Sequence, residues 1–301
     1  MSESSRAWLI DASVYIFRAW FSLPDRWHSP GGMPLNAVVG YAGFLHEILE
    51  HTSPDAHLIA AFDESLGSCF RNEIYAGYKA SRELPDEALA FQLQACRELS
   101  ERAGLPCFGG PRYEADDYLA TLARLAREQG LAVSVLTRDK DLGQLLHRDD
   151  DRWWDYAADR ELDAAAFAAH FGVTPGQFAD YLALVGDAID DIPGVPGVGP
   201  KTAAALLQGF GTLHAMAAAP QRIAELPVRG AQRLWQRIEP HWAQVQVSRQ
   251  LARLEDSIPG LDELPSCQRG ASSHAAVADY LRELGLGGVA VARWQRGGEG
   301  A

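Results

Sequence analysis

The stretch from Leu184 to Ala205 reads LVGDAIDDIPGVPGVGPKTAAA and combines acidic and glycine-rich chemistry in one short segment. Asp187 and Asp190 are three residues apart, so in a helix both carboxylates would lie on one face. Carboxylate oxygens are the ligands that hard cations prefer. The acidic half of the stretch therefore predicts a site for a single cation, with Asp191 pointing elsewhere.

The second half of the stretch predicts a tight hairpin that leads into a helix. Gly194, Gly197 and Gly199 remove side chains from the turn. Pro200 stands where the first residue of a helix is preferred, ahead of the apolar run 203–207. Free amides at such a helix start favour an anion such as a phosphate. The alternative is a surface turn rich in glycine and proline, with incidental acids.

Length and composition bound the class of protein. A chain of 301 residues is long for one domain, so we expect one large domain with an appended subdomain. The four cysteines form no CxxC pair and no zinc-spaced cluster with histidine, which indicates free thiols in a reducing compartment and no structural zinc. No stretch of the sequence resembles a signal peptide, and no apolar run approaches the ~20 residues that a membrane span requires. It therefore predicts a cytoplasmic protein without a membrane partner.

The formal net charge of -13 argues, taken alone, against nucleic-acid binding, because such proteins usually present a basic surface. Many of the acids, however, fall at positions that predict one shared pocket. Divalent cations bound in such a pocket would cancel much of the negative charge. A polyanion can then bind through a few local lysine and arginine residues.

Three short apolar runs predict buried strands, and each run leads to acidic residues. The runs and their acids are 7–11 with Asp11, 57–62 with Asp63, and 131–136 with Asp139 and Asp141. Helical patterns lie between the runs, which is the alternation expected of a parallel α/β sheet. Ligand sites lie beyond the carboxyl ends of such strands, so we expect these acids to converge on one edge.

A long excursion over 64–111 separates the second run from the third. Its first half is basic and aromatic, with side chains that can contact phosphates or stack on bases: Arg71, Lys79, Arg82, Tyr75 and Tyr78. The alternative interpretation is a solvated amphipathic helix. The second half predicts a helix over 87–102, and a further helix opens at Glu114, whose carboxylate shares a face with that of Asp117.

Nine acids are candidate metal ligands: Asp11, Asp63, Glu114, Asp116, Asp117, Asp139, Asp141, Asp187 and Asp190. Two like charges about 4 Å apart repel by roughly 4 kcal/mol at an effective dielectric of about 20, so these acids cannot share a pocket without cations. Oxygen ligands select Mg²⁺ or Mn²⁺ over zinc. Two such ions would activate a water and stabilise the leaving oxygen of a phosphodiester. No Ser/His/Asp set and no P-loop competes, so phosphodiester hydrolysis is the predicted reaction.

The order and spacing of six motifs resemble those of the 5' nuclease (flap endonuclease) superfamily, in particular the small bacterial and phage 5'-3' exonucleases and the N-terminal domain of bacterial DNA polymerase I. The motifs are LIDASVYIFRAW, AAFD, FRNEIYAGYKASR, YEADDYLATLA, TRDKDLGQLL and GDAIDDIPGVPGVGPKTA, and they span 8–207. The resemblance implies an α/β nuclease core with a parallel, PIN-like sheet and a helical arch. It also implies a helix-three-turn-helix, a variant of the helix-hairpin-helix, that binds duplex DNA around a potassium ion.

The resemblance implies a role for each candidate residue. All nine acids match the family's metal-binding positions, for two or more Mg²⁺ ions that Mn²⁺ can replace. Lys79 matches the arch lysine that approaches the scissile phosphate, and Arg71 and Arg82 are candidate catalytic phosphate contacts. The implied DNA-binding residues are Phe17, which would stack on a terminal base, with Tyr78, Gly197, Val198, Gly199, Lys201 and Thr202. Asp191 stands where the family usually has Asn, which weakens the prediction of potassium.

The predicted domains are a catalytic core over 1–170 that includes the arch, a helix-hairpin-helix subdomain with a helical extension over 171–260, and a C-terminal tail over 261–301. The predicted protein is a monomeric, structure-specific 5' nuclease. It would act as a 5'-3' exonuclease and flap endonuclease on DNA, including RNA-primed 5' ends, in primer removal or repair beside a polymerase and a ligase. Two alternatives stay open: a non-catalytic binder of DNA junctions and a ribonuclease of the related PIN-type fold.

Overall fold

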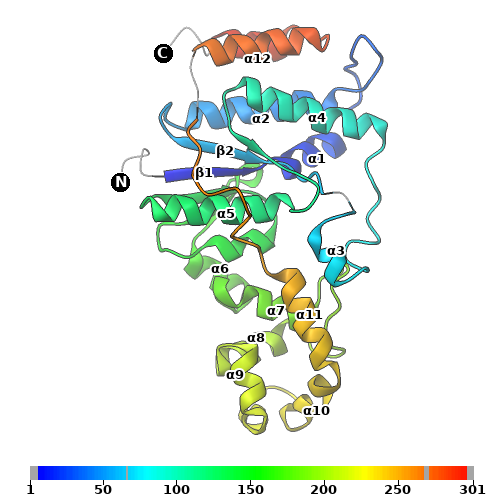
Figure 1. Ribbon diagram of the computed structural model, residues 1–301, viewed down its shortest axis with the longest axis vertical. Coiled ribbons are helices and arrows are strands. Elements are labelled where there is room, and N and C mark those ends of the chain that lie inside the picture. The colour runs from blue at the N-terminus through cyan, green and yellow to red at the C-terminus, as the bar shows by residue number, and fades with distance from the viewer. Residues whose placement is uncertain (1–5, 66, 268–270, 297–301) are drawn as a thin grey trace. The chain divides into compact units, whose positions relative to one another are not determined.

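The computed structural model describes residues 6–65, 67–267 and 271–296 (Figure 1). The chain forms two compact units. The first, called here the sheet unit, comprises Met1–Ser65, Leu84–Arg138 and Asp256–Ala301, and the second, the helical unit, comprises Leu66–Glu83 and Asp139–Glu255. These units divide the chain differently from the predicted domains, because 66–83 and 139–170 pack with the helical unit. No helix in the described residues is long and apolar enough to span a membrane.

The sheet unit is built on four parallel strands. In the order β3-β2-β1-β4 they are Cys107–Phe108, His57–Ala61, Arg6–Asp11 and Ala132–Leu136. Trp8 of β1 lies beside Leu58 and Ser134 in the register of the sheet. The three predicted strands are therefore confirmed, and their carboxyl ends lie at one edge. The two-residue β3 was not predicted because it is too short to carry a pattern.

Helices cover both faces of these strands. They are α1 (Ala12–Ser22), α2 (Asn36–His51), α4 (Glu87–Arg102) and α5 (Ala115–Glu128). In Figure 1, α2 and α4 lie on one side of the strands and α5 on the other. Buried Gln92 of α4 accepts hydrogen bonds from the amides of Ala37 (2.7 Å) and Val38 (3.2 Å), which fixes α4 on the start of α2.

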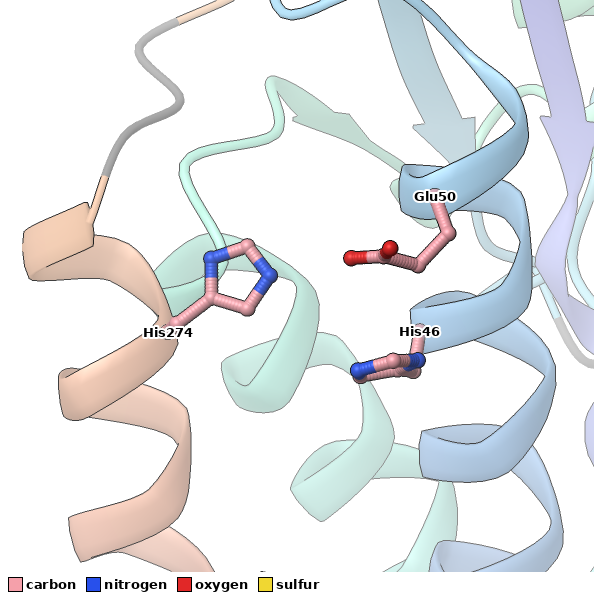
Figure 2. Close-up of side chains that lie close together, drawn as sticks. All are labelled: His46, Glu50 and His274. Atoms are coloured by element: carbon pink, nitrogen blue, oxygen red, sulfur yellow. The ribbon is translucent and has the colours of Figure 1, made fainter. Parts of the chain in front are cut away.

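The end of the chain forms two helices, where a tail was predicted. They are α12 (Ala271–Glu283) and α13 (Val289–Arg296), and they pack on α4 and α2. The Arg102 guanidinium lies 4.6 Å from the ring centre of Tyr280, and Trp294 is only 1% exposed. Figure 2 shows the facing sides of α2 and α12.

The helical unit combines short helices with one antiparallel strand pair. Its α-helices and strands are α3 (Phe70–Ile74), β5 (Arg152–Asp155), β6 (Arg160–Leu162), α6 (Ala164–Phe171), α7 (Phe178–Val185), α8 (Pro200–Phe210), α9 (Leu213–Ala218), α10 (Leu234–Ile238) and α11 (Trp242–Ala252). The 3-10 helices are η2 (Lys140–Leu145), η3 (Tyr156–Ala158), η4 (Pro175–Gln177), η5 (Pro220–Glu225), η6 (Ala231–Arg233) and η7 (Glu239–His241). Pro200 is the first residue of α8, as predicted.

The segment that contains Asp187 and Asp190 is not helical, so the condition for a shared helix face is not met. Helix α7 ends at Val185, and Gly186 adopts a φ of 82°, which a helix cannot continue. Asp187 and Ile192 then exchange two backbone hydrogen bonds of 2.8 Å, closing a tight turn that contains Asp190. The two carboxylates consequently do not share a helix face, and each has its own partners.

Candidate metal centre and its basic neighbours

In the sheet unit, Asp11 is held by a neighbouring strand. It is the last residue of β1, and its side chain is only 3% exposed. The hydroxyl of Thr137, which follows β4, donates a 2.8 Å hydrogen bond to Asp11 Oδ2. This bond fixes one oxygen of the carboxylate at the edge where the strands end.

The other acids of the sheet unit are also oriented by local hydrogen bonds. Asp63 follows β2; its amide donates to Ser13 Oγ at 2.9 Å, and its Oδ1 accepts from Ser65 Oγ at 3.0 Å. Glu114 and Asp117 form a capping box at the start of α5, in which Asp117 Oδ2 accepts from the Glu114 amide at 3.1 Å. Asp117 is fully buried, whereas Asp116 is partly exposed. These acids are thus preorganised around the ends of the strands.

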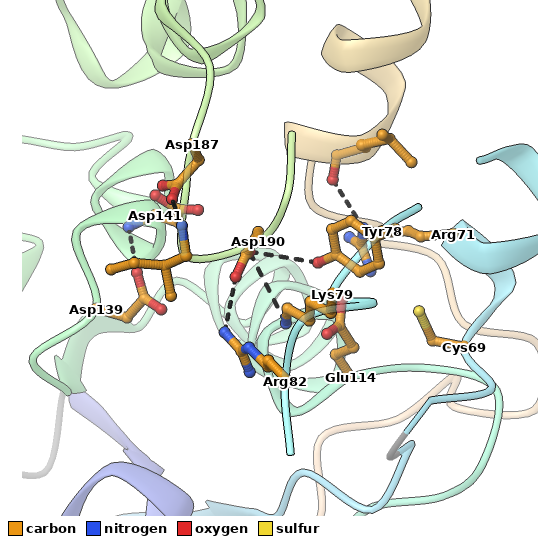
Figure 3. A network of polar contacts seen from close by, with 12 residues as sticks. Cys69, Arg71, Tyr78, Lys79, Arg82, Glu114, Asp139, Asp141, Asp187 and Asp190 are labelled. Carbon is orange, nitrogen blue, oxygen red and sulfur yellow. Dashed lines mark hydrogen bonds and ion pairs between the residues drawn. The ribbon is translucent and has the colours of Figure 1, made fainter. Parts of the chain in front are cut away.

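In the helical unit, Asp139, Asp141 and Asp187 lie near one another (Figure 3). Lys140 forms ion pairs with Asp141 and Asp187. Asp139 caps η2, because its Oδ1 accepts from the Asp141 amide at 2.8 Å. Trp153 Nε1 donates to the Asp139 carbonyl at 2.7 Å. The Lys140 ammonium lies 3.2 Å from Asp141 Oδ1 and donates to Asp187 Oδ2. Lys140 therefore serves as an internal counterion of this acid cluster.

Burial and charge shift the pKa values in the cluster. Burial, and then the neighbouring Asp139, raise the pKa of Asp141 to about 7. Burial acts to lower the pKa of Lys140, but Asp141 and Asp187 outweigh it, so the pKa is raised. Burial acts to raise the pKa of Asp187, but the hydrogen bond from Lys140 outweighs it, so the pKa is lowered. Although both contact Lys140, Asp141 thus has a raised pKa and Asp187 a lowered one.

One oxygen of this cluster fits a cation. Asp141 Oδ1 is buried, and within 6–65, 67–267 and 271–296 it meets no hydrogen-bond donor, although Lys140 lies close to it as an ion pair. A buried acceptor without a donor is costly unless an ion satisfies it. Since the surrounding ligands are carboxylate oxygens, the residues present fit a hard divalent cation.

Asp190 is instead paired with basic side chains of the 66–83 segment. Arg82 Nη2 lies 2.7 Å from Asp190 Oδ1, Lys79 Nζ lies 3.9 Å from Oδ2, and the Tyr78 hydroxyl donates to Oδ2 at 3.4 Å (Figure 3). The Lys79 backbone has a φ of 51°, a left-handed conformation, and its amide donates to the Asp190 carbonyl at 3.0 Å. Two of the three predicted catalytic cations are therefore held against a predicted metal ligand.

The third predicted cation, Arg71, occupies a different environment. Its side chain is 2% exposed, and its guanidinium donates to the carbonyls of Leu251 (2.8 Å) and Arg253 (3.0 Å). The predicted phosphate contact is therefore not supported, because the donors that would face a phosphate anchor α3 to the end of α11. Tyr78, predicted to bind DNA, is likewise 3% exposed, so its ring is not available for stacking.

The hairpin before α8 presents fewer amides than predicted. The Val198 amide donates to the Val195 carbonyl and the Thr202 amide to the Gly199 carbonyl, both at 3.0 Å. Gly199 caps α8, and the Lys201 side chain is exposed beside it, so these two stay candidates for phosphate binding. Gly197 has a φ of 78°, which only glycine adopts easily.

The structure also places two further residues of the sequence analysis, Asp191 and Phe17. Asp191 turns its carboxylate to the Ser81 amide at 2.8 Å, so this side chain is engaged within the helical unit. Phe17 lies on α1 and is partly exposed.

The sequence interpretation missed three side chains that orient or neutralise the acids: Thr137, Ser13 and Lys140. Each stands within three residues of a predicted ligand in the chain. Thr137 follows a strand that ends at the acidic edge, and Lys140 lies between two predicted ligands, so adjacency was the available signal. Which acid each one contacts depends on strand order, which the sequence does not state.

Three features together define a class of metal-dependent nucleases. They are carboxylates at the ends of parallel strands, two cations paired to one acid, and a glycine hairpin ahead of a helix. Sequence comparison specifies the family. Residues 6–172 match the family described as 5'-3' exonuclease, N-terminal resolvase-like domain, and residues 173–273 match the 5'-3' exonuclease, C-terminal SAM fold. The chain therefore belongs to the 5'-3' exonuclease family, which confirms the resemblance. It is accordingly an enzyme of the divalent-metal-dependent nuclease class.

Individual proteins agree with this assignment. The chain is 33% identical over 265 residues to DNA polymerase I of Rhizobium leguminosarum and 36% identical over 277 residues to that of Pseudomonas aeruginosa. These matches cover 86% and 92% of this chain but only 25% and 30% of the relatives, so the chain spans less than a third of their length.

Solved structures support the fold. T5 5'-exonuclease with bound divalent zinc ions gives a TM-score of 0.65 at 19% identity, covering 98% of both chains. The catalytic core of Rad2 in complex with a DNA substrate gives 0.60 at 16% identity, covering 94% of this chain and 89% of that chain. At these identities the likeness extends to the fold alone.

Proposed function

We propose that this protein is a structure-specific 5' nuclease that hydrolyses phosphodiesters of DNA at 5' ends and flaps. The observation that carries the proposal is the buried Asp141 Oδ1, which lacks a donor among the described residues and lies in a cluster of carboxylates. Family membership supplies the reaction class, and the cluster supplies a place for the ions that this class requires.

The residues that would hold divalent ions are the two acid groups already described. The sheet unit offers Asp11, Asp63, Glu114, Asp116 and Asp117, and the helical unit offers Asp139, Asp141, Asp187 and Asp190. When bound, such ions activate a water and stabilise the negative charge that develops on the phosphate. Mg²⁺ is the ion we favour, with Mn²⁺ as a substitute, because all the proposed ligands are oxygens.

The chain's own cations act on the substrate. Arg82 and Lys79 neutralise Asp190 in this structure. A divalent ion on Asp190 would compete for the same oxygens, and the released side chains could then contact the phosphate under attack. Lys140 would in the same way leave Asp141 and Asp187. Before the divalent ions bind, these internal counterions thus neutralise part of the negative charge of the acids.

DNA would be held mainly through its backbone. Exposed Lys201 and the Gly199 amide stand at the start of α8, where an anion is favoured. In the helical unit, a groove of about 580 Å³ is lined by Tyr75, Gly77, Ser81, Asp187 and Asp191, among others. The groove runs beside the acidic turn, and we propose that it receives one strand. Binding should weaken steeply with salt, because the contacts are to phosphates.

The test is cleavage of a 5'-end-labelled DNA flap and of a matched blunt duplex, with Mg²⁺ or with EDTA. We expect Mg²⁺-dependent cutting near the flap junction that is lost in Asp139→Asn. A matched control is Asp149→Asn, because Asp149 is an exposed acid ten residues further on. Binding of the flap should survive in Asp139→Asn.

The alternative function, a non-catalytic junction binder, makes the opposite prediction. It requires tight flap binding without cutting, alike in the wild type and in Asp139→Asn. Cutting of an RNA flap and not of a DNA flap would instead favour the ribonuclease.

Several finer proposals need assays of their own. A potassium ion at the hairpin stays a prediction, and Asp191 argues against it because its carboxylate is engaged by the Ser81 amide. We propose a monomer that acts in the cytoplasm on RNA-primed or damaged 5' ends, in sequence with a polymerase and a ligase. Titration with potassium, sedimentation and coupled assays would test these points separately.

A further inference from the structure

Away from the nuclease acids, the sheet unit contains a cluster of three potential ligands for a transition metal. His46 and Glu50 lie on α2, and His274 lies on α12. One ligand atom from each of these side chains lies within 4.8 Å of the other two. Figure 2 shows the three side chains extending from the two helices into the space between them.

The spacing of these residues suits a bound ion. His46 and Glu50 are four residues apart on one helix, so they share a face. Zinc bonds of about 2.0–2.1 Å place tetrahedral ligand atoms about 3.4 Å apart, so small side-chain rotations would close this cluster around an ion. Two imidazoles and a carboxylate are a known zinc ligand set, in which water takes the fourth position. Glu50 is exposed, which gives that water access.

One ring nitrogen of each histidine is left without a partner in the described residues, although His46 also has a backbone hydrogen bond with Arg293. Nε2 of His46 and Nε2 of His274 are both buried, and in the described part of the chain neither meets a hydrogen-bond partner. Buried polar atoms of this kind are uncommon and call for an explanation such as an ion. Burial, the largest influence, also lowers the pKa of His46, which favours the neutral imidazole that binds metal.

The surroundings hold the two rings in place. Trp294 of α13 is 1% exposed, and its ring centre lies 5.2 Å from that of His46 and 5.4 Å from that of His274. The rings of His46 and His274 are perpendicular, with centres 6.1 Å apart. An aromatic wall of this kind orients ligands and restricts solvent.

We propose that His46, Glu50 and His274 form a zinc site that joins α12 to α2 and leaves one coordination position to water. This inference departs from the sequence prediction of no structural zinc. Sequence spacing could not reveal the site, because His274 is brought to α2 only by the fold. Around the site, Arg293 lies 3.5 Å from Glu47, and Arg102 lies 3.5 Å from Glu283, so the terminal helices also have contacts that need no metal.

The test measures bound zinc after dialysis of the full chain against Zn²⁺ with excess Mg²⁺, which occupies the oxygen-rich nuclease acids. We expect Glu50→Gln, His274→Gln and the double variant His46→Gln/His274→Gln to bind about one zinc fewer than the wild type. The matched control is His214→Gln, because His214 is an exposed histidine of α9, and it should bind as much zinc as the wild type.

Thermal unfolding provides a second measurement. Zinc should raise the unfolding temperature of the wild type and of His214→Gln, but not that of His274→Gln. Flap cutting in Mg²⁺ should be unchanged in His274→Gln, since this residue is outside the nuclease machinery. Equal zinc content in the wild type and the double variant would overturn the proposal. So would an equal zinc-induced stabilisation of the two proteins.

Discussion

Arg82 lies 2.7 Å from Asp190, so a predicted catalytic cation and a predicted metal ligand neutralise each other in this structure. Arg82 is an exposed residue. In the proposed mechanism, Arg82 exchanges its carboxylate partner for a phosphate during turnover. Charge-assisted hydrogen bonds of this kind are strong enough for the exchange to influence the rate.

We predict that Arg82→Ala reduces the turnover of a 5' flap by roughly tenfold to a thousandfold, which is the usual effect of removing one donor to a developing negative charge. Single-turnover cleavage rates would measure it. The substitution should change the free energy of unfolding by less than about 0.5 kcal/mol, because the side chain is exposed. Arg26→Ala, which removes another exposed arginine, is the control and should cut at the wild-type rate.

Arg71→Ala should behave in the opposite way, as a stability variant. Its loss removes the donors to the buried Leu251 carbonyl and to the partly buried Arg253 carbonyl. We expect the free energy of unfolding to fall by on the order of 3 kcal/mol, measured by urea denaturation. Arg71→Lys should not restore it, because an ammonium cannot reproduce the planar guanidinium. Wild-type stability in Arg71→Ala would contradict the anchoring role.

Asp141 should make the metal-free protein less stable as the pH rises. Its pKa is about 7 in the folded chain and near 4 when unfolded, so its contribution is fully present below about pH 4 and is lost as the pH rises through about 7. The difference amounts to at most roughly 4 kcal/mol. Urea denaturation in EDTA across this range would show it.

In Asp141→Asn this part of the pH dependence should be absent. Adding Mg²⁺ should restore stability to the wild type at high pH but not to the variant, since the ion replaces the proton on the buried oxygen. If the stability of the wild type varied with pH in the same way as that of Asp141→Asn, the prediction that Asp141 titrates in this range would be wrong.

Thr137→Val is expected to weaken metal binding. Valine has nearly the shape of threonine, but it removes the 2.8 Å hydrogen bond to Asp11. We expect a several-fold higher Mg²⁺ requirement for cutting and a loss of about 1 kcal/mol in the free energy of unfolding. Thr52→Val, which removes a buried hydroxyl bonded to the Ile48 carbonyl, is the control. It should lower stability without changing the Mg²⁺ requirement.

Two glycines of the hairpin should respond differently to alanine. A Cβ at Gly194 would meet the Val185 carbonyl oxygen at 2.1 Å, whereas a Cβ at Gly199 would meet nothing within 4 Å. Gly194→Ala should therefore disrupt the acidic turn and abolish flap binding, and Gly199→Ala should leave both nearly intact. Circular dichroism and fluorescence anisotropy with a labelled flap would separate the two variants. Equal binding by both would contradict the close approach at Gly194.

The sequence predicted the parts of the fold that depend on local pattern. The strands that end at Asp11, before Asp63 and before Asp139 are continuous apolar runs, and α8 begins at Pro200 as its rigid φ requires. Strand β6 was missed because Arg-Glu-Leu carries no apolar pattern. The three-residue spacing of Asp187 and Asp190 would place them on one face of a helix, but Gly186, with its φ of 82°, ends the helix before them.

The site was predictable as a list of acids and not as a set of contacts. Asp139 and Asp141 were identified by their position after a strand. Lys140 is adjacent to both in the sequence, but its contact with Asp187 forms only through folding across a long stretch of chain. Arg71 shows the same limit for a residue whose predicted role the structure does not support. Its motif indicates a phosphate contact, but in the folded chain its guanidinium donates to the carbonyl of Leu251.

The chain passes from one unit to the other several times, and this order of segments has a consequence for biosynthesis. The sheet unit consists of three separate segments, the last of which begins at Asp256, whose carbonyl accepts a 2.8 Å hydrogen bond from Arg124. Chains emerge from the ribosome with the N-terminus first, and units generally fold as wholes. The helical unit, complete at Glu255, can therefore form while the sheet unit still awaits α12 and α13. Translational stalling late in the message would leave a nascent protein whose α2 and α4 lack the covering helices α12 and α13.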